Sequence, residues 1–234
     1  MSRQIKGLLY FYVTDSRYSF MIFWSILLMI MILFLGIAYF MLNVEGGMFT
    51  FGFPFATYIN VAIIGFITVK ERIPFALKMG AVRKNIYVAT GIFFLGYALF
   101  IALLSSTIQS LMLWVIDITN LHTFMFLHPA QLLGSDIWIT RVMIDTAVMF
   151  LLAVFMYIIG LLFYRGGVLA GGILIGILGG ALLFGIAQGV IIESLIKLYH
   201  TIDLMFFAQI FGIGIVLYAL TYFLVRTITT VKVR

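Results

Sequence analysis

The sequence has 234 residues, of which 65% are hydrophobic and 9% are charged, with a formal net charge of +6. Soluble domains carry about 25% charged residues, so this composition excludes a soluble fold and predicts one integral membrane domain over residues 1–234. The basic residues lie beside the apolar runs, so the positive charge does not indicate nucleic-acid binding. The sequence contains no cysteine, which excludes disulfides and thiolate metal sites.

The first nineteen residues are polar enough to stay outside the membrane core. Ile5, Leu8, Leu9 and Tyr12 recur at helical spacing, which predicts an amphipathic helix lying in the membrane interface. A frayed tail is the alternative interpretation.

Six apolar runs follow, and each approaches or exceeds the ~20 residues that a helix needs to cross a bilayer. We expect an all-α membrane protein whose six spans are Phe20–Leu42, Phe51–Val69, Ile86–Leu113, Val142–Phe163, Val168–Val190 and Leu204–Val225.

The distribution of basic residues predicts the orientation. Six spans place both termini on one side, and all fourteen Lys and Arg residues except Arg141 and Lys197 then lie on that side. The positive-inside rule therefore predicts a multi-pass membrane protein with both termini in the cytoplasm. An apolar stripe along residues 191–203 predicts a short external helix before the last span.

The most charged segment is the cytoplasmic loop 70–85, between the second and third spans. Pro74 suits the start of a short helix, and Gly80 suits a left-handed residue just after its end. The apolar residues in this aqueous loop favour a surface that docks a soluble partner, although a loop that only fixes topology is the alternative. The candidate docking residues are Glu71, Arg72, Phe75, Leu77, Lys78, Met79, Gly80, Arg83 and Lys84.

The sequence lacks the usual motifs of nucleotide-binding and metal sites. A phosphate-binding loop needs a Gly-Lys dipeptide, which the sequence lacks, so any ATP must bind to another chain. His122 and His128 are six apart, which matches no usual zinc spacing, and we expect them to be surface histidines. Asp145 follows Arg141 by one helical turn, which favours a local ion pair over a proton-relay role. We expect no metal and no catalytic activity in this chain.

Small and polar residues within the spans suggest two further sites. Gly172, Gly176 and Gly180 lie on one face of the fifth run and predict close packing at a subunit interface, with packing inside the subunit as the alternative. Asn60 and Gln188 are candidates for a cargo pathway, with interhelical hydrogen bonding as the alternative. The abundance of Phe and Tyr would make any cavity apolar and suited to an amphipathic or hydrophobic cargo.

This layout resembles the membrane subunits of type-2 ABC exporters, and the stretch 75–87, with its Gly-x-x-Arg-Lys run, looks like their coupling-helix region. The resemblance implies that separate ABC ATPase subunits bind ATP and Mg and dock on a coupling helix. It also implies a place in the bacterial cytoplasmic membrane, a second identical or related permease subunit, and outward transport of a peptide, drug or lipid-like cargo. The alternatives are a substrate-binding membrane subunit of an uptake system and a secondary transporter, while an intramembrane enzyme lacks its residues.

Overall fold

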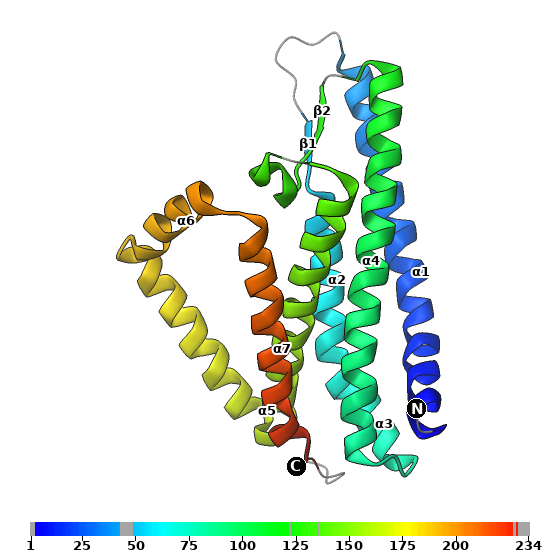
Figure 1. Cartoon of the computed structure of the whole chain (residues 1–234), viewed down its shortest axis with the longest axis vertical. Helices are drawn as coiled ribbons and strands as arrows, with labels where there is room; N and C mark the ends of the chain where they lie inside the picture. The colour runs from blue at the N-terminus through cyan, green and yellow to red at the C-terminus, as the bar shows by residue number, and fades with distance from the viewer. Residues whose placement is uncertain (1–2, 43–48, 122, 135, 227, 229–234) are drawn as a thin grey trace.

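The computed structural model describes residues 3–42, 49–121, 123–134, 136–226 and 228, without the side chains of 195, 196 and 198–201. The chain is almost entirely helical (Figure 1). Its elements are α1 (Arg3–Phe40), β1 (Phe49–Phe51), α2 (Phe53–Ile67), the π-helix η1 (Thr68–Arg72), α3 (Ile73–Lys78), α4 (Arg83–Thr119), β2 (Phe124–Phe126), the 3-10 helix η2 (Pro129–Leu133), α5 (Trp138–Ala187), α6 (Val190–Thr201) and α7 (Leu204–Arg226).

Helix α1 corrects the prediction of a separate interfacial helix. It runs unbroken for 38 residues, about 57 Å at the ordinary helical rise, so it is much longer than a ~30 Å hydrocarbon core. The predicted apolar stripe does exist, and Ile5, Leu8 and Tyr12 are buried. They face the bundle, where α1 packs mainly on α4. The segment before residue 20 contains no proline, so nothing separates it from the span.

The predicted cytoplasmic loop 70–85 is mostly helical. Helices α2, η1 and α3 follow one another without a break, so only residues 79–82 connect them to α4. Gly80 has φ of 76°, and the N–H groups of Gly80 and Ala81 donate to the carbonyls of Leu77 and Ala76. This pattern is a Schellman cap, as Gly80 predicted. Pro74 occupies the first turn of α3, directly after the π-helical turn, so it lies inside a continuous helical segment and does not start a separate helix as predicted.

Helix α5 contains two limbs that meet at Gly167, where φ is 68° and ψ is −167°. Only glycine adopts this conformation readily. The chain reverses direction there, so that an inner limb (138–166) runs through the bundle and an outer limb (168–187) returns to α6 (Figure 1). Among the described residues, five helices are long and apolar enough to cross a membrane, and α5 accounts for two of the predicted apolar runs.

The inner limb of α5 is the centre of the bundle and packs on α2, α4 and α7. It approaches α2 closely, since a Cβ added to Gly65 would lie 2.2 Å from the carbonyl oxygen of Ala153. A Cβ on Gly160 would similarly meet Val69. Small residues therefore bring these two backbones together, as is usual in membrane bundles.

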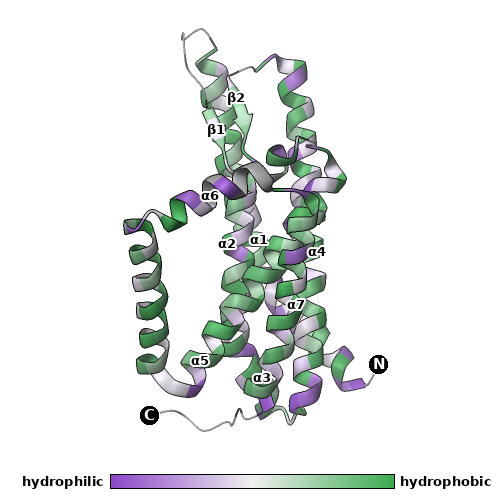
Figure 2. Ribbon diagram, turned by 60° about the vertical axis from the view of Figure 1, so that its left-hand side comes forward, coloured by the Kyte–Doolittle hydropathy of each residue, from purple (hydrophilic) through white to green (hydrophobic). Residues whose placement is uncertain are grey.

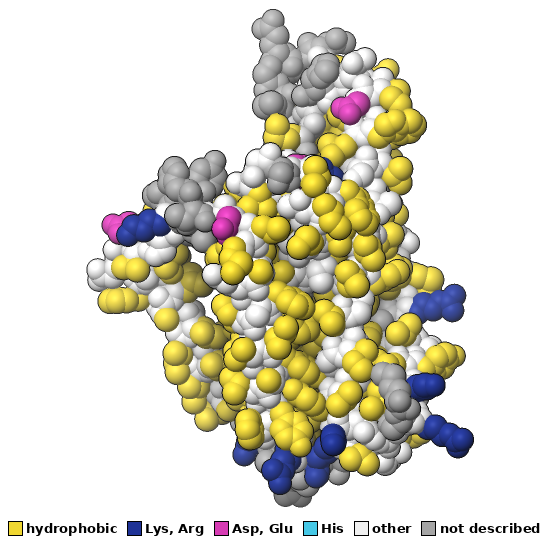
Figure 3. All heavy atoms as spheres, viewed as in Figure 1, with side chains coloured by type: hydrophobic (Ala, Val, Ile, Leu, Met, Phe, Trp, Pro, Cys, Tyr) yellow, Lys and Arg dark blue, Asp and Glu magenta, His cyan; other side chains and the backbone are white. Residues whose placement is uncertain are grey.

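The two ends of the molecule differ in charge and in structure. Apolar residues cover most of the helices between the ends (Figure 2). Lys and Arg side chains gather at the end where α1 begins and α7 ends (Figure 3). At the other end β1 and β2 form a parallel pair with Phe49 opposite Phe124 and Phe51 opposite Phe126. We call the end with the Lys and Arg side chains the basic end and the end with β1 and β2 the strand end.

Candidate functional site

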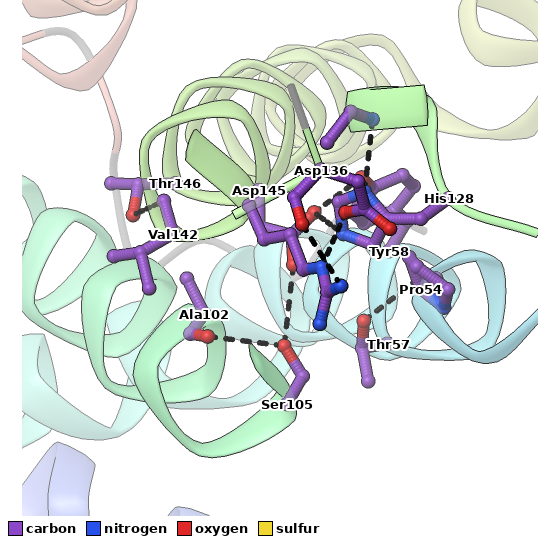
Figure 4. A network of polar contacts seen from close by, with 12 residues as sticks. Pro54, Thr57, Tyr58, Ala102, Ser105, His128, Asp136, Val142, Asp145 and Thr146 are labelled. Atoms are coloured by element: carbon purple, nitrogen blue, oxygen red, sulfur yellow. Dashed lines mark hydrogen bonds and ion pairs between the residues drawn. The ribbon is translucent and has the colours of Figure 1, made fainter. Parts of the chain in front are cut away.

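A buried polar cluster surrounds Asp145 on the inner limb of α5, where its side chain is 1% exposed (Figure 4). Tyr58 of α2 donates a hydrogen bond to Oδ1 at 2.6 Å, and Ser105 of α4 donates to Oδ2 at 3.3 Å. His128, between β2 and η2, brings its Nε2 to 3.3 Å from Oδ1, without the angle of a formed hydrogen bond. One carboxylate thus joins three helical segments and the loop at the strand end.

The hydrogen bonds of His128 identify its tautomer. Its Nδ1 accepts from the backbone N–H of Ala130 at 2.9 Å, which caps η2. A nitrogen that accepts carries no hydrogen, so the neutral ring has its hydrogen on Nε2, the atom that faces Asp145. Protonation of Nδ1 would put two N–H groups against each other. The cap of η2 therefore depends on a neutral His128.

Asp145 does not form the predicted ion pair with Arg141. The Nε of Arg141 donates to Asp136, and its Nη1 donates to Ser110. The prediction of an Arg141–Asp145 ion pair is wrong because α5 begins at Trp138. Asp136 therefore lies outside the helix, where its carboxylate can reach Arg141. His128, expected at the surface, is buried. His122 lies outside the described residues.

The carboxylate of Asp145 is buried and hydrogen-bonded. An ionised carboxylate in apolar surroundings is costly unless hydrogen bonds satisfy it, and Tyr58 and Ser105 supply such bonds. Two buried polar atoms on α4 lack a hydrogen-bond partner in the described part of the chain. They are Ser106 Oγ and Gln109 Nε2. Within that part there is no group of three residues able to hold a metal ion.

A second buried cluster lies toward the basic end and contains Arg72, whose side chain is 2% exposed. Its Nε donates to Asp15 of α1 at 2.8 Å, and its Nη2 donates to Ser16 at 2.7 Å. The guanidinium also lies over the rings of Tyr12 and Phe93, at 5.8 and 5.0 Å from their centroids. Arg72 therefore joins α1 to the end of η1, and its predicted role on a docking surface is wrong because its side chain is covered.

The other predicted docking residues lie on η1, on α3, in the turn 79–82 and at the start of α4, and we call this region the α3–α4 corner. Phe75 is 47% exposed although it stacks on Phe11, with ring centroids 4.7 Å apart, and Met79 is 73% exposed. Leu77 is half-buried against the core. The remaining members are all exposed, and they are Glu71, Lys78, Gly80, Arg83 and Lys84.

The predicted glycine face is open among the described residues. A Cβ added to Gly172, Gly176 or Gly180 would meet no atom within 4 Å, so these residues do not pack inside the described subunit. Gln188 is exposed at the end of the outer limb. Asn60 is buried in α2 and accepts a hydrogen bond from Tyr97 of α4 at 3.2 Å. The two cargo-pathway candidates thus occupy different surroundings.

Comparison with known proteins identifies no family: no family model matches the sequence, and no curated protein or solved structure matches it. Sequence reasoning singled out Asp145 but missed Tyr58 and Ser105, since tyrosine and serine within apolar runs give no signal until the helices are packed.

Proposed function

We propose that this chain is the permease subunit of an ATP-driven exporter, in which a separate ATPase subunit docks on the α3–α4 corner. The observation that carries the proposal is the exposure of Phe75 and Met79 beside the bases Lys78, Arg83 and Lys84. Leaving such a side chain in water forgoes about 1.5–3 kcal/mol of burial free energy, so an apolar pair at the basic end calls for a partner surface.

The corner is suited to transmitting motion. Residues 53–78 form one uninterrupted helical segment, and the Schellman cap at Gly80 fixes the turn into α4. The Arg72 cluster ties the same place to α1. A force applied at the corner would therefore act on the 53–78 segment, on α4 and on α1 together. The ATPase partner would supply the bound ATP and Mg, and this chain contributes no chemical step.

The proposal includes a second identical or related permease subunit. The outer limb of α5 exposes its glycine face and most of its large side chains, including Val168, Leu169 and Leu183. Packing between small residues stabilises helix pairs in membranes, which favours a facing helix from another subunit. In this arrangement the outer limb is a span of its own, giving six spans with both termini in the cytoplasm, and the cargo moving between the subunits is amphipathic or hydrophobic.

The test is purification of the affinity-tagged full chain from its own host membranes, followed by measurement of ATP hydrolysis per chain. Phe75→Asp should remove the co-purifying hydrolysis, because a charge would enter an apolar contact. Leu132→Asp is the matched control, since Leu132 is an exposed apolar residue at the strand end. Equal hydrolysis in wild type and Phe75→Asp would refute the docking assignment.

A proton-coupled secondary transporter is the second candidate, favoured by the buried Asp145 and His128. Intramembrane acids with a histidine neighbour can relay protons. This candidate predicts that proteoliposomes containing only this chain transport the cargo when a pH gradient is applied without ATP. The Asp145→Asn variant should not transport it. Transport under those conditions would replace the exporter proposal, whereas the exporter requires ATP and a second kind of subunit.

A further inference from the structure

A groove between α1 and α4 is independent of the corner, the Asp145 cluster and the glycine face. It has a volume of about 700 Å³, within the range of small-molecule sites. Its walls are apolar and aromatic along most of their length, and the lining includes Tyr10, Val13, Phe20, Gly96 and Phe100. We call it the α1–α4 groove.

Arg17 lines this groove, and its side chain is exposed. The acid nearest to it in sequence, Asp15, is paired with Arg72 instead. None of the ion pairs in the described part of the chain includes Arg17. The groove thus combines apolar walls with one guanidinium that has no acidic partner among the described residues.

The position of Arg17 along α1 fits the level of lipid headgroups. Helix α1 is too long for the membrane core, so part of it must project, and the projecting part is the polar segment before residue 20. Before residue 20 the exposed apolar residues Tyr10, Val13 and Tyr18 stand singly among polar ones, whereas from Met21 and Ile22 onward the exposed side chains are almost all apolar. Arg17 therefore stands at the boundary between polar and apolar surroundings, where basic side chains meet the phosphates of a bilayer.

We propose that the α1–α4 groove binds an anionic phospholipid, with its headgroup phosphate on Arg17 and an acyl chain along Phe20, Gly96 and Phe100. A guanidinium donates two parallel hydrogen bonds to a phosphate, and the apolar walls match a hydrocarbon chain. A helix from a second copy fits less well. The outer limb of α5 contains no acidic residue, so covering the groove with it would bury Arg17 unpaired.

Gly96 permits a substitution that fills the groove without disturbing the fold. A Cβ added there meets no atom within 4 Å, so Gly96→Leu places a side chain in open space. Gly36 of α1 has equally open surroundings and lies outside the groove, which makes Gly36→Leu its matched control. Lys6 is an exposed base on the same helix outside the groove, so Lys6→Gln controls for Arg17→Gln.

The test is native mass spectrometry of the delipidated full chain, titrated with phosphatidylglycerol or with phosphatidylcholine of the same acyl chains. The wild type should bind one phosphatidylglycerol more tightly than phosphatidylcholine. Arg17→Gln should weaken phosphatidylglycerol binding about fivefold, the effect of removing one base facing an anionic lipid, and weaken phosphatidylcholine binding less, because the choline cation offsets the charge of that lipid's phosphate. Gly96→Leu should weaken both, and the two controls should match wild type.

Two results would overturn the proposal. Equal losses in Lys6→Gln and Arg17→Gln would mean that lipid responds only to overall charge. Unchanged lipid binding in Gly96→Leu, together with a shift from dimer to monomer in the same spectra, would identify a second copy of the chain as the occupant. Neither result depends on the ATPase docking proposed above, because the measurement needs only this chain and lipid.

Discussion

Arg72 and Asp15 are 57 positions apart in the sequence, and their side chains meet at 2.8 Å. Arg72 lies on the π-helical turn that ends α2, and Asp15 lies on the segment of α1 that projects toward the basic end. π-helical turns recur at functional sites because they redirect side chains within a helix. This pair fixes α1 beside the α3–α4 corner, and it is the main contact that we expect to hold the corner rigid.

The first prediction follows from that pair. Arg72→Gln should lower the free energy of unfolding by about 1–3 kcal/mol, because it removes charged hydrogen bonds from a buried position. Asp15 is partly exposed and can be rehydrated, which limits the loss. Thermal unfolding in detergent measures the effect. Arg226→Gln, at the exposed end of α7, should leave the unfolding temperature unchanged, and an equal shift in both variants would argue against the cluster.

The Asp145 cluster gives the second prediction. Tyr58→Phe removes the 2.6 Å hydrogen bond and should destabilise the protein by about 1 kcal/mol, whereas Tyr18→Phe at an exposed tyrosine should have no effect. The loop between β2 and η2, which contains His128, should also become more mobile. A single cysteine at Leu127 would be labelled faster in Tyr58→Phe than in the wild-type background, and unchanged labelling would mean that the cluster does not hold the loop.

The third prediction compares two glycines. Gly65→Ala would place Cβ against the backbone of Ala153, so the helices must separate and the folded yield should fall. Gly176→Leu enters open space within the chain, so the subunit should fold normally. If the outer limb meets a second subunit, Gly176→Leu should nevertheless abolish the dimer, as mass measurements in detergent would record. An intact dimer would leave the glycine face against lipid.

Topology supplies the fourth prediction. The chain has no cysteine, so single cysteines at Lys78 and Leu132 can be labelled separately with an impermeant thiol reagent. Leu132 should react in intact cells, and Lys78 only after the membrane is opened, since the two residues lie at the basic and strand ends. Labelling of both residues in intact cells would contradict cytoplasmic placement of the basic end.

The sequence predicted the membrane class and the apolar segments because long uncharged runs have few alternatives. It failed where packing decides. The polar segment before Phe20 stays helical because Tyr12 and its neighbours pack against α4, which periodicity alone could not distinguish from packing against lipid. The local partner expected for Asp145 was wrong because Tyr58 and His128, 87 and 17 positions from it, reach it only after folding.

The prediction for the loop 70–85 shows the same limit. Gly80 marked the end of the short helix, since a left-handed residue has a local signature. The burial of Arg72 had no such signature, because a basic residue in a cytoplasmic loop is ordinarily exposed. The exposed residues Phe75 and Met79 remain available for a partner, which we propose to be an ATPase subunit.

A photoreactive amino acid at Met79 tests this claim most directly, because Met79 is the most exposed apolar side chain of the α3–α4 corner. After irradiation of host membranes, the account predicts a cross-linked product containing a chain with the Gly-x-x-x-x-Gly-Lys-Ser/Thr motif of a nucleotide-binding loop. The same amino acid at Leu132 should give no such product. Cross-linking of Met79 to lipid alone, with no nucleotide-binding chain attached, would contradict the account.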